Sequence, residues 1–147
     1  MIRAATHADV ERVVDLGQIL HASSDFAPIS YDRDKVSSLM HSLINGAGVL
    51  FVAEREGVVI GGIAGAITTY WFSEEFVGFD YSFFLEPTQR NGFTALKLIN
   101  AFKIWCKGRG ATRLKMGITT GLNVEKISRF YLLAGFNYAG PLFEMEL

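Results

Sequence analysis

One turn in the second half of the chain has residue types suited to binding phosphate. It reads Thr88-Gln89-Arg90-Asn91-Gly92-Phe93-Thr94 and leads from an expected strand into an expected helix. A helix start presents free backbone N–H groups and the positive end of the helix dipole, and both favour an anion. Arg90 adds a positive charge, and no carboxylate follows it as far as Lys115. A phosphate site and an ordinary loop-to-helix turn both agree with this pattern, because Gly and Asn are common in such turns.

Other kinds of chemistry lack the residues that they need. The motifs G-x-x-x-x-G-K-[ST], G-x-G-x-x-G and G-x-S-x-G are all absent, which disfavours a nucleotide P-loop, a dinucleotide fingerprint and a serine nucleophile elbow. Cys106 is the single cysteine and follows Trp105 on the apolar face of an expected helix, so we expect a buried thiol and not a nucleophile. We expect no metal site and only surface or boundary roles for the histidines, which have no ligand spacing: His7, His21 and His41.

The charges are divided unevenly along the chain. The formal net charge is only −1, but residues 1–86 carry −7, residues 87–124 carry +7 with no acidic residue, and residues 125–147 carry −1. The basic segment contains the turn around Arg90, which agrees with an anionic ligand there. We expect no nucleic-acid partner, because the chain is net acidic and has no motif that reads DNA or RNA.

A single domain over residues 1–147 is expected to position these residues. A chain of 147 residues is long enough to bury one hydrophobic core and too short for two. Half of the residues are hydrophobic and 20% are charged, which is typical of a folded domain. No apolar stretch is long enough to span a membrane, and Met1-Ile2-Arg3 leads directly into a strand without a signal-peptide pattern. With one cysteine and no disulfide, we expect a cytoplasmic protein.

Hydrophobic periodicity predicts the element order β-α-α-β-β-β-α-β-α-β-β. Thr6 and Asp9 have the spacing of a capping box at the start of the first helix. The strand Phe76–Leu85, the helix that contains Ala95–Cys106 and the strand Ala111–Thr119 should form a β-α-β unit with parallel strands. The expected strands are Ile2–Ala5, Val49–Glu54, Val58–Trp71, Phe76–Leu85, Ala111–Thr119, Phe136–Ala139 and Leu142–Leu147, and the expected helices follow Thr6, surround Val36–Ile44, contain Ala95–Cys106 and follow Asn123.

The chain resembles the GNAT superfamily of acyl-CoA-dependent N-acyltransferases. The likeness rests on the element order, on Leu85-Glu86-Pro87 leading into Gln89-Arg90-Asn91-Gly92-Phe93-Thr94-Ala95, and on Asn123 followed by Phe130-Tyr131-Leu132-Leu133-Ala134-Gly135-Phe136. It covers nearly the whole chain. It implies an α/β (α+β) fold with a mixed, mostly antiparallel central sheet flanked by helices, and acetyl-CoA (coenzyme A) as the cosubstrate.

The resemblance also implies which residues bind the cosubstrate. In the family a Q/R-x-x-G-x-G/A loop holds the pyrophosphate, and two registers are possible here, Gln89-x-x-Gly92-x-Thr94 and Arg90-x-x-Phe93-x-Ala95. We prefer the second register, because it keeps the spacing from Pro87, although it puts phenylalanine at the glycine position. The implied binding residues are the backbone of Phe84 and Leu85, which faces the thioester carbonyl, the loop residues Arg90, Asn91, Gly92, Phe93, Thr94 and Ala95, and Asn123. Asn123 can be a helix N-cap, a donor to the pantetheine amides, or both.

Two side chains are candidates for the proton transfers that the resemblance implies. Tyr131 is a phenol that stays protonated at neutral pH and so can protonate a leaving thiolate, although it could also be only a polar-tipped core residue. Asp80 is the only carboxylate inside the strand before the turn and is the candidate base, either directly or through water. Its alternative is a solvated or paired carboxylate, and Glu74 and Glu75 are the second choices for the base.

We therefore expect an N-acetyltransferase in which a primary amine attacks the thioester directly. The alternative is a GNAT-like module that binds CoA with little or no turnover and has a structural or regulatory role. The acceptor is a small-molecule or peptide amine, and the family places acceptor contacts in the stretches His21–Tyr31, which includes Asp25 and Phe26, and Tyr70–Glu75. Their acidic residues favour a cationic amine, while core packing explains their aromatic residues equally well. Exposed strand edges leave a homodimer open.

Overall fold

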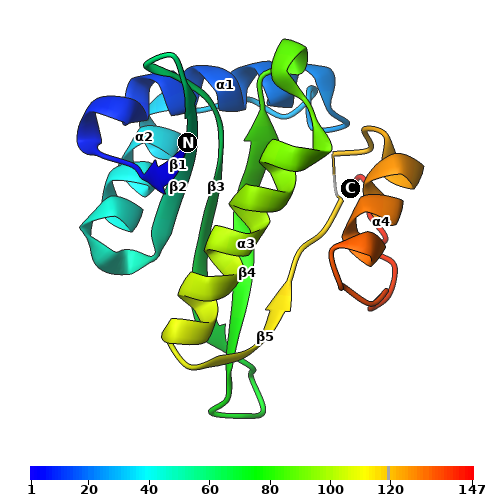
Figure 1. Ribbon diagram of the computed structural model, residues 1–147. Helices are drawn as coiled ribbons and strands as arrows, with labels where there is room; N and C mark the ends of the chain where they lie inside the picture. Colours follow the sequence, from blue (N-terminus) through cyan, green and yellow to red (C-terminus); the bar gives the residue numbers. More distant parts are fainter. Residues whose placement is uncertain (119) are drawn as a thin grey trace.

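A five-stranded sheet forms the centre of the protein, which is described by a computed structural model for residues 1–118 and 120–147 (Figure 1). The strand order is β1-β2-β3-β4-β5. Neighbouring strands are antiparallel except for β4 and β5, which are parallel, so the predicted mixed and mostly antiparallel sheet is confirmed. The strands are β1 (Ile2–Ala4), β2 (Val49–Arg55), β3 (Val58–Thr69), β4 (Phe76–Leu85) and β5 (Ala111–Lys115).

Helices cover both faces of the sheet. Helices α1 (Val10–Ser23) and α2 (Arg33–Ser42) pack on one face, and α3 (Gly92–Gly108) packs on the other. Helix α4 (Val124–Leu133) lies on the β5 side of the sheet (Figure 1). Short helical turns at His7–Asp9, Leu43–Ala47 and Pro87–Gln89 connect these elements. None of the helices described for this chain is both long and apolar enough to cross a membrane.

The predicted capping box at the start of the first helical segment is confirmed. The backbone N–H of Thr6 donates to Oδ2 of Asp9 over 2.7 Å. Arg3 in β1 holds the same carboxylate at 2.8 Å and keeps the pKa of Asp9 near 2, well below its usual range. The first strand and the first helix are therefore joined at one charged contact.

Glycines in β3 let aromatic rings from the neighbouring elements lie directly on the strand. The ring of Phe102 in α3 is fully buried and covers Gly65. A Cβ atom at position 65 would collide with this ring and would lie 2.6 Å from the carbonyl oxygen of Phe79. On the neighbouring stretch of β3, a Cβ atom at Gly62 would lie 2.8 Å from the ring of Phe84. The close packing of Phe102 and Phe84 on β3 therefore requires glycine, which has no side chain, at positions 65 and 62.

The two predicted closing strands are wrong. Residues 136–147 form no strand, so neither Phe136–Ala139 nor Leu142–Leu147 adds to the sheet. A strand needs both a pairing edge and a face to bury, and the apolar side chains here have neither, since Phe143 is 89% exposed. The strand predicted over Ala111–Thr119 ends at Lys115, and Thr119 lies outside the described residues.

We predict that Gly65→Ala lowers the free energy of unfolding by about 1–3 kcal/mol, because Phe102 and the β4 backbone must move to admit the new methyl group. The matched control is Gly108→Ala at the end of α3, where no described atom beyond its chain neighbours and the backbone of its own helix lies within 4 Å of the added Cβ. That change should be neutral or should stabilise the protein by up to about 1 kcal/mol. Urea denaturation of both variants measures the difference, and equal effects would contradict the packing described for Gly65.

Candidate functional site

Strands β4 and β5 separate halfway along β4. They are paired only from Phe76 opposite Ala111 to Phe79 opposite Lys115, and the second half of β4 has no strand on this side within the described residues (Figure 1). At the same point β4 has one extra residue relative to β3, and this residue, Tyr81, forms a β-bulge. The bulge and the separation together expose one edge of residues 80–85.

A cavity of about 550 Å³ opens beside this free edge. The second half of β4 forms one wall, and α1 and α2 contribute apolar side chains to a second. Helix α4 and the segment before it form the third wall, and the N-terminal turn of α3 lies at the margin. Among the residues predicted for the site, the lining includes Asp80, Phe84, Leu85, Arg90, Asn91, Gly92, Ala95, Asn123 and Tyr131.

Two loops that are distant in sequence meet at this cavity. The backbone N–H of Asp25, after α1, donates to the carbonyl oxygen of Thr120 over 2.8 Å. Gly121 has a φ of +73°, and a Cβ atom there would collide with the Asp25 carboxylate. Glycine is therefore the residue that suits position 121, where the two walls of the cavity touch.

Backbone N–H groups of β4 face the gap. The N–H of Glu86 donates to the carbonyl oxygen of Ile60 in β3 over 2.7 Å. Because successive N–H groups of a strand point to opposite sides, those of Leu85 and Phe83 point away from β3 and into the gap. Of the two implied residues, Leu85 thus turns its N–H toward the gap, whereas the N–H of Phe84 faces β3. Sequence reasoning missed Phe83, because its orientation depends on the pairing with β3.

The start of α3 offers a positive charge and backbone N–H groups. Asn91 caps the helix, since its Oδ1 accepts the N–H of Thr94 over 2.9 Å. The N–H groups of Gly92 and Phe93 precede the first helical hydrogen bonds and have no acceptor in the described part of the chain. Arg90 lies at the cavity margin, where its Nε donates to the carbonyl oxygen of Leu85 over 3.2 Å.

The side chain of Phe93 does not enter the cavity. It is 70% exposed, and the ammonium group of Lys97 lies 4.4 Å from the centre of its ring. Phe93 and Thr94 are the two predicted loop residues that do not line the cavity. The bulky residue at the expected glycine position is thus directed toward solvent.

Asp80 and Tyr131 are brought together in the cavity. Burial raises the pKa of Asp80 to about 6, although backbone N–H groups of Asp80 and Gly117 favour its charged form. Burial also raises the pKa of Tyr131, and the nearby Asp80 carboxylate raises it further. The Tyr131 hydroxyl donates to the carbonyl oxygen of Gly117 over 3.3 Å. The site therefore combines a carboxylate with a raised pKa and a phenol that stays protonated at neutral pH.

Asn123 lines the cavity but does not cap α4 with its side chain. It stands at the N-cap position with a left-handed backbone, φ 46°, and its side chain accepts no hydrogen bond from the helix. The predicted side-chain cap is therefore wrong. The other alternative, in which its amide group contacts a bound ligand, stays a prediction.

Comparison with known proteins agrees with this geometry. A sequence profile of the acetyltransferase (GNAT) family matches residues 16–136. The chain belongs to the GNAT family. The comparison with curated proteins found no match.

Solved acetyltransferases share the GNAT fold of this chain. Aminoglycoside N-acetyltransferase AAC(6')-Iy, in complex with CoA, superposes with a TM-score of 0.80 at 17% identity over 100% of this chain and 93% of that protein. AAC(6')-IG from Acinetobacter haemolyticus gives 0.76 at 18% identity over 100% and 97% of the two chains. An acetyltransferase from Trypanosoma brucei gives 0.73 at 16% identity over 100% and 99%. These likenesses establish the shared fold.

Some of the predicted acceptor residues lie away from the cavity. The stretch Tyr70–Glu75 connects β3 to β4 at the opposite end of β4 from the cavity, and none of its residues lines it (Figure 1). Trp71 in this stretch is 96% exposed. Glu74 and Glu75 therefore do not reach the cavity as bases. In contrast, His21, Phe26 and Tyr31 from the other predicted stretch do line it.

His21, the first residue of the predicted acceptor stretch, lines the cavity, although no ligand role was expected for the histidines themselves. Its ring is half-buried, and Nε2 is buried without a hydrogen-bond partner among the described residues. The sequence signal for its place in the cavity is its spacing, because His21 continues the α1 face formed by Val13, Gly17 and Leu20.

The predicted buried thiol of Cys106 is confirmed, and burial raises its pKa to about 11.

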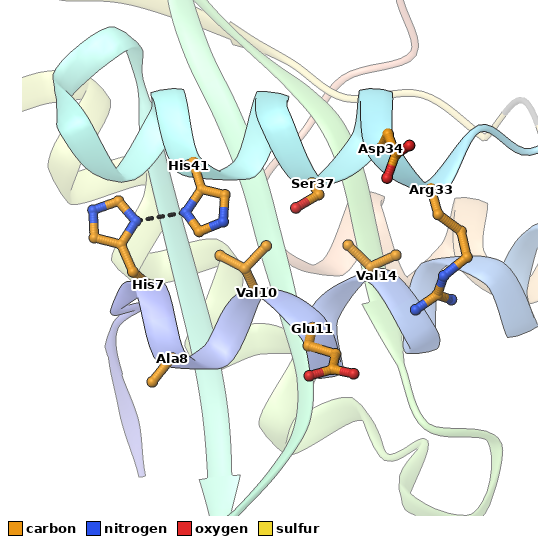
Figure 2. A pocket seen from close by; sticks show the side chains of 9 residues that line it. All are labelled: His7, Ala8, Val10, Glu11, Val14, Arg33, Asp34, Ser37 and His41. Atoms are coloured by element: carbon orange, nitrogen blue, oxygen red, sulfur yellow. Dashed lines mark hydrogen bonds between the residues drawn. The ribbon is translucent and has the colours of Figure 1, made fainter.

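A second hollow lies between α1 and α2, and two of the histidines that line it contact each other. Figure 2 shows His7 and His41 facing each other across it, with their Nδ1 atoms 2.6 Å apart. Nε2 of His7 also lies 3.0 Å from Oδ1 of Asn45. Arg33, at the other end of the hollow, donates to Asp15 over 2.7 Å. These contacts join α1 and the turn before it to α2 and the turn after it. No group of three or more side chains that could hold a metal ion occurs in residues 1–118 or 120–147.

We predict that Asp80→Asn stabilises the protein at neutral pH by about 3 kcal/mol. The folded-state pKa of Asp80, about 6, exceeds its ordinary value of 3.8, so between these pH values the folded state binds more protons than the unfolded state. Ionisation of Asp80 therefore lowers the free energy of unfolding as the pH rises from 4 through 6.

Urea denaturation of the wild type and of Asp80→Asn at pH 4, 5, 6, 7 and 8 measures this effect. The stability difference should grow with pH and level off above pH 7. Glu74→Gln, on the exposed β3–β4 connection, serves as the control for loss of a carboxylate. A difference between Asp80→Asn and the wild type that does not change with pH would contradict the prediction.

Proposed function

We propose that the protein is an N-acetyltransferase that moves the acetyl group of acetyl-CoA to the primary amine of a small molecule. The observation that carries the proposal is the cavity where the free edge of β4, the start of α3 and the Asp80–Tyr131 pair meet. Family membership supports acyl transfer. The shared fold of two aminoglycoside N-acetyltransferases, one of them in complex with CoA, supports a small-molecule amine and this cosubstrate.

The residues present fit both parts of coenzyme A. Its pyrophosphate needs positive charge and N–H donors, which Arg90 and the N–H groups of Gly92 and Phe93 supply at the start of α3. Its pantetheine arm carries amide groups, which can form hydrogen bonds with the backbone of an extended strand. The free edge of β4 supplies such a partner in the N–H of Leu85, and Asn123 lies on the opposite wall.

The protein's own groups then account for the proton transfers and the charge. Bound acetyl-CoA supplies a thioester, at whose carbonyl carbon a C–N bond forms while the C–S bond breaks and CoA leaves as the thiol. Asp80 accepts a proton from the amine, for which its raised pKa makes it a stronger base than an ordinary carboxylate. Tyr131 gives its proton to the leaving sulfur, and the N–H group of Phe83 donates to the developing negative oxygen.

The position of Phe93 favours turnover over an inactive CoA-binding module. That alternative depends on the bulky residue at the glycine position of the loop. The Phe93 ring is directed toward solvent beside Lys97, and therefore leaves the cavity free. Release of CoA with any amine in a thiol assay would exclude the inactive module, whereas CoA binding without release across a broad amine panel would favour it.

We predict that Arg90→Ala raises the Kd for CoA about tenfold, because it removes a charged donor at the start of α3. Lys107→Ala is the matched control: it removes one positive charge at the far end of the same helix and should change the Kd less than twofold. Isothermal titration calorimetry with CoA at fixed ionic strength measures both. Equal effects would mean that only the summed charge of the basic segment acts.

We predict that Tyr131→Phe lowers kcat about 100-fold and leaves the Kd for CoA within about twofold of the wild type, because only the proton donor is lost. The control is Tyr138→Phe, which removes a hydroxyl from a residue that is 77% exposed and lies outside the cavity. Steady-state thiol release with an accepted amine measures kcat. An unchanged kcat in Tyr131→Phe would remove Tyr131 from the role of acid.

A further inference from the structure

The part of the cavity under α1 and α2 is lined mostly by apolar side chains. Val13 and Leu20 of α1, Leu39 and Met40 of α2, and Phe84 of β4 all line it. These residues belong to the hydrophobic core on this face of the sheet or pack against it. An acceptor that fills this space therefore needs an apolar body, because a polar one would lose its hydration without finding partners.

The cavity has little negative charge to offer to a cation. Among the described residues that line it, Asp80 is the only carboxylate, whereas Arg90 and Lys126 are both cationic. The carboxylate of Asp25 is turned toward Gly121, and Asp25 does not line the cavity. A polyamine would bring several ammonium groups to one carboxylate and leave most of them unpaired. The cavity therefore suits an acceptor with a single amino group.

One polar atom in the apolar part lacks a partner. Nε2 of His21 is buried without a hydrogen bond to any described residue. The neighbouring Tyr31, whose ring centre lies 5.2 Å from that of His21, already donates its hydroxyl to the carbonyl oxygen of Val14 over 2.9 Å. Buried polar atoms in proteins are nearly always hydrogen-bonded, so an unpaired one at a cavity wall points to a ligand group.

We infer that the acceptor is a compact monoamine with an aromatic or alkyl body and one further polar group, such as a hydroxyl, that binds Nε2 of His21. Its amino group lies at Asp80 and its body fills the space under α1 and α2. This inference rests on the proposed function of the same cavity. It adds the substrate class, because an acetyltransferase with the same catalytic pair and an acidic cavity would select polyamines instead.

A panel of four amines tests the substrate class with the full chain and acetyl-CoA. Tyramine and 2-phenylethylamine are monoamines with and without a hydroxyl, and spermidine and neamine are polycations. Thiol release and mass spectrometry of the products should give a kcat/KM for tyramine at least tenfold above that for either polycation. Equal or better turnover of the polycations would overturn the inference while leaving the proposed function intact.

Calorimetric titration of the same amines into the CoA-bound protein separates the inference from the proposed function. Selective binding of tyramine without turnover of any amine would support the substrate class and contradict the transferase activity. Absence of tyramine binding at millimolar concentration, or tighter binding of spermidine or neamine, would overturn the substrate class whether or not the protein turns over.

His21→Leu tests the polar contact. Replacing the ring by an apolar side chain of similar size should lower the ratio of tyramine to 2-phenylethylamine kcat/KM at least fivefold, mainly through KM, because the hydroxyl loses its partner. His41→Leu makes the same exchange at a half-buried histidine outside the cavity and should leave the ratio unchanged. An unchanged ratio in His21→Leu would overturn the role of His21.

Discussion

The separation of β4 from β5 after Phe79 is the constraint on which the site depends. It leaves backbone N–H and C=O groups of residues 80–85 without a strand partner on one side, which a protein tolerates only where another group bonds them. The other side of β4 is paired with β3 from Phe76 to Leu85, interrupted by the bulge at Tyr81. The backbone N–H and C=O groups along this edge therefore lack strand partners, while the pairing with β3 holds them in position. A ligand with amide groups of its own can form hydrogen bonds to such an edge.

The basic character of residues 87–124 is distributed over several surfaces and is not concentrated at the cavity. Of the seven basic residues, only Arg90 lines it. Three others lie against aromatic rings elsewhere: Lys97 over Phe93, Arg109 over Trp105 and Lys115 over Tyr70. Cation–π contacts of this kind contribute to stability locally. The charge asymmetry of the sequence thus indicates only which segment favours an anion, and the start of α3 is the specific place that we propose for it.

The sequence predicted elements that form through local interactions and missed features that depend on partners. The helix start at Thr6 follows from capping chemistry within three residues, and the parallel β4–β5 pair follows from the helix between the strands. The closing strands failed because strand formation needs a partner edge, which periodicity does not report. The N–H of Phe83 points into the gap because of the pairing with β3, and the unpaired Nε2 of His21 depends on its surroundings in the folded protein, where the hydroxyl of the neighbouring Tyr31 is already bonded to Val14.

The contact between Asp25 and the segment at Thr120 and Gly121 links the evolution of two walls of the cavity. These loops are almost a hundred residues apart, yet one backbone hydrogen bond and one glycine fix their separation. An insertion after α1 that reshapes the space for an acceptor would also displace the segment that precedes α4 and Tyr131. Loop lengths on the two sides are therefore expected to change together among relatives, so that new acceptors arise by paired changes in these loops while the edge of β4 stays constant.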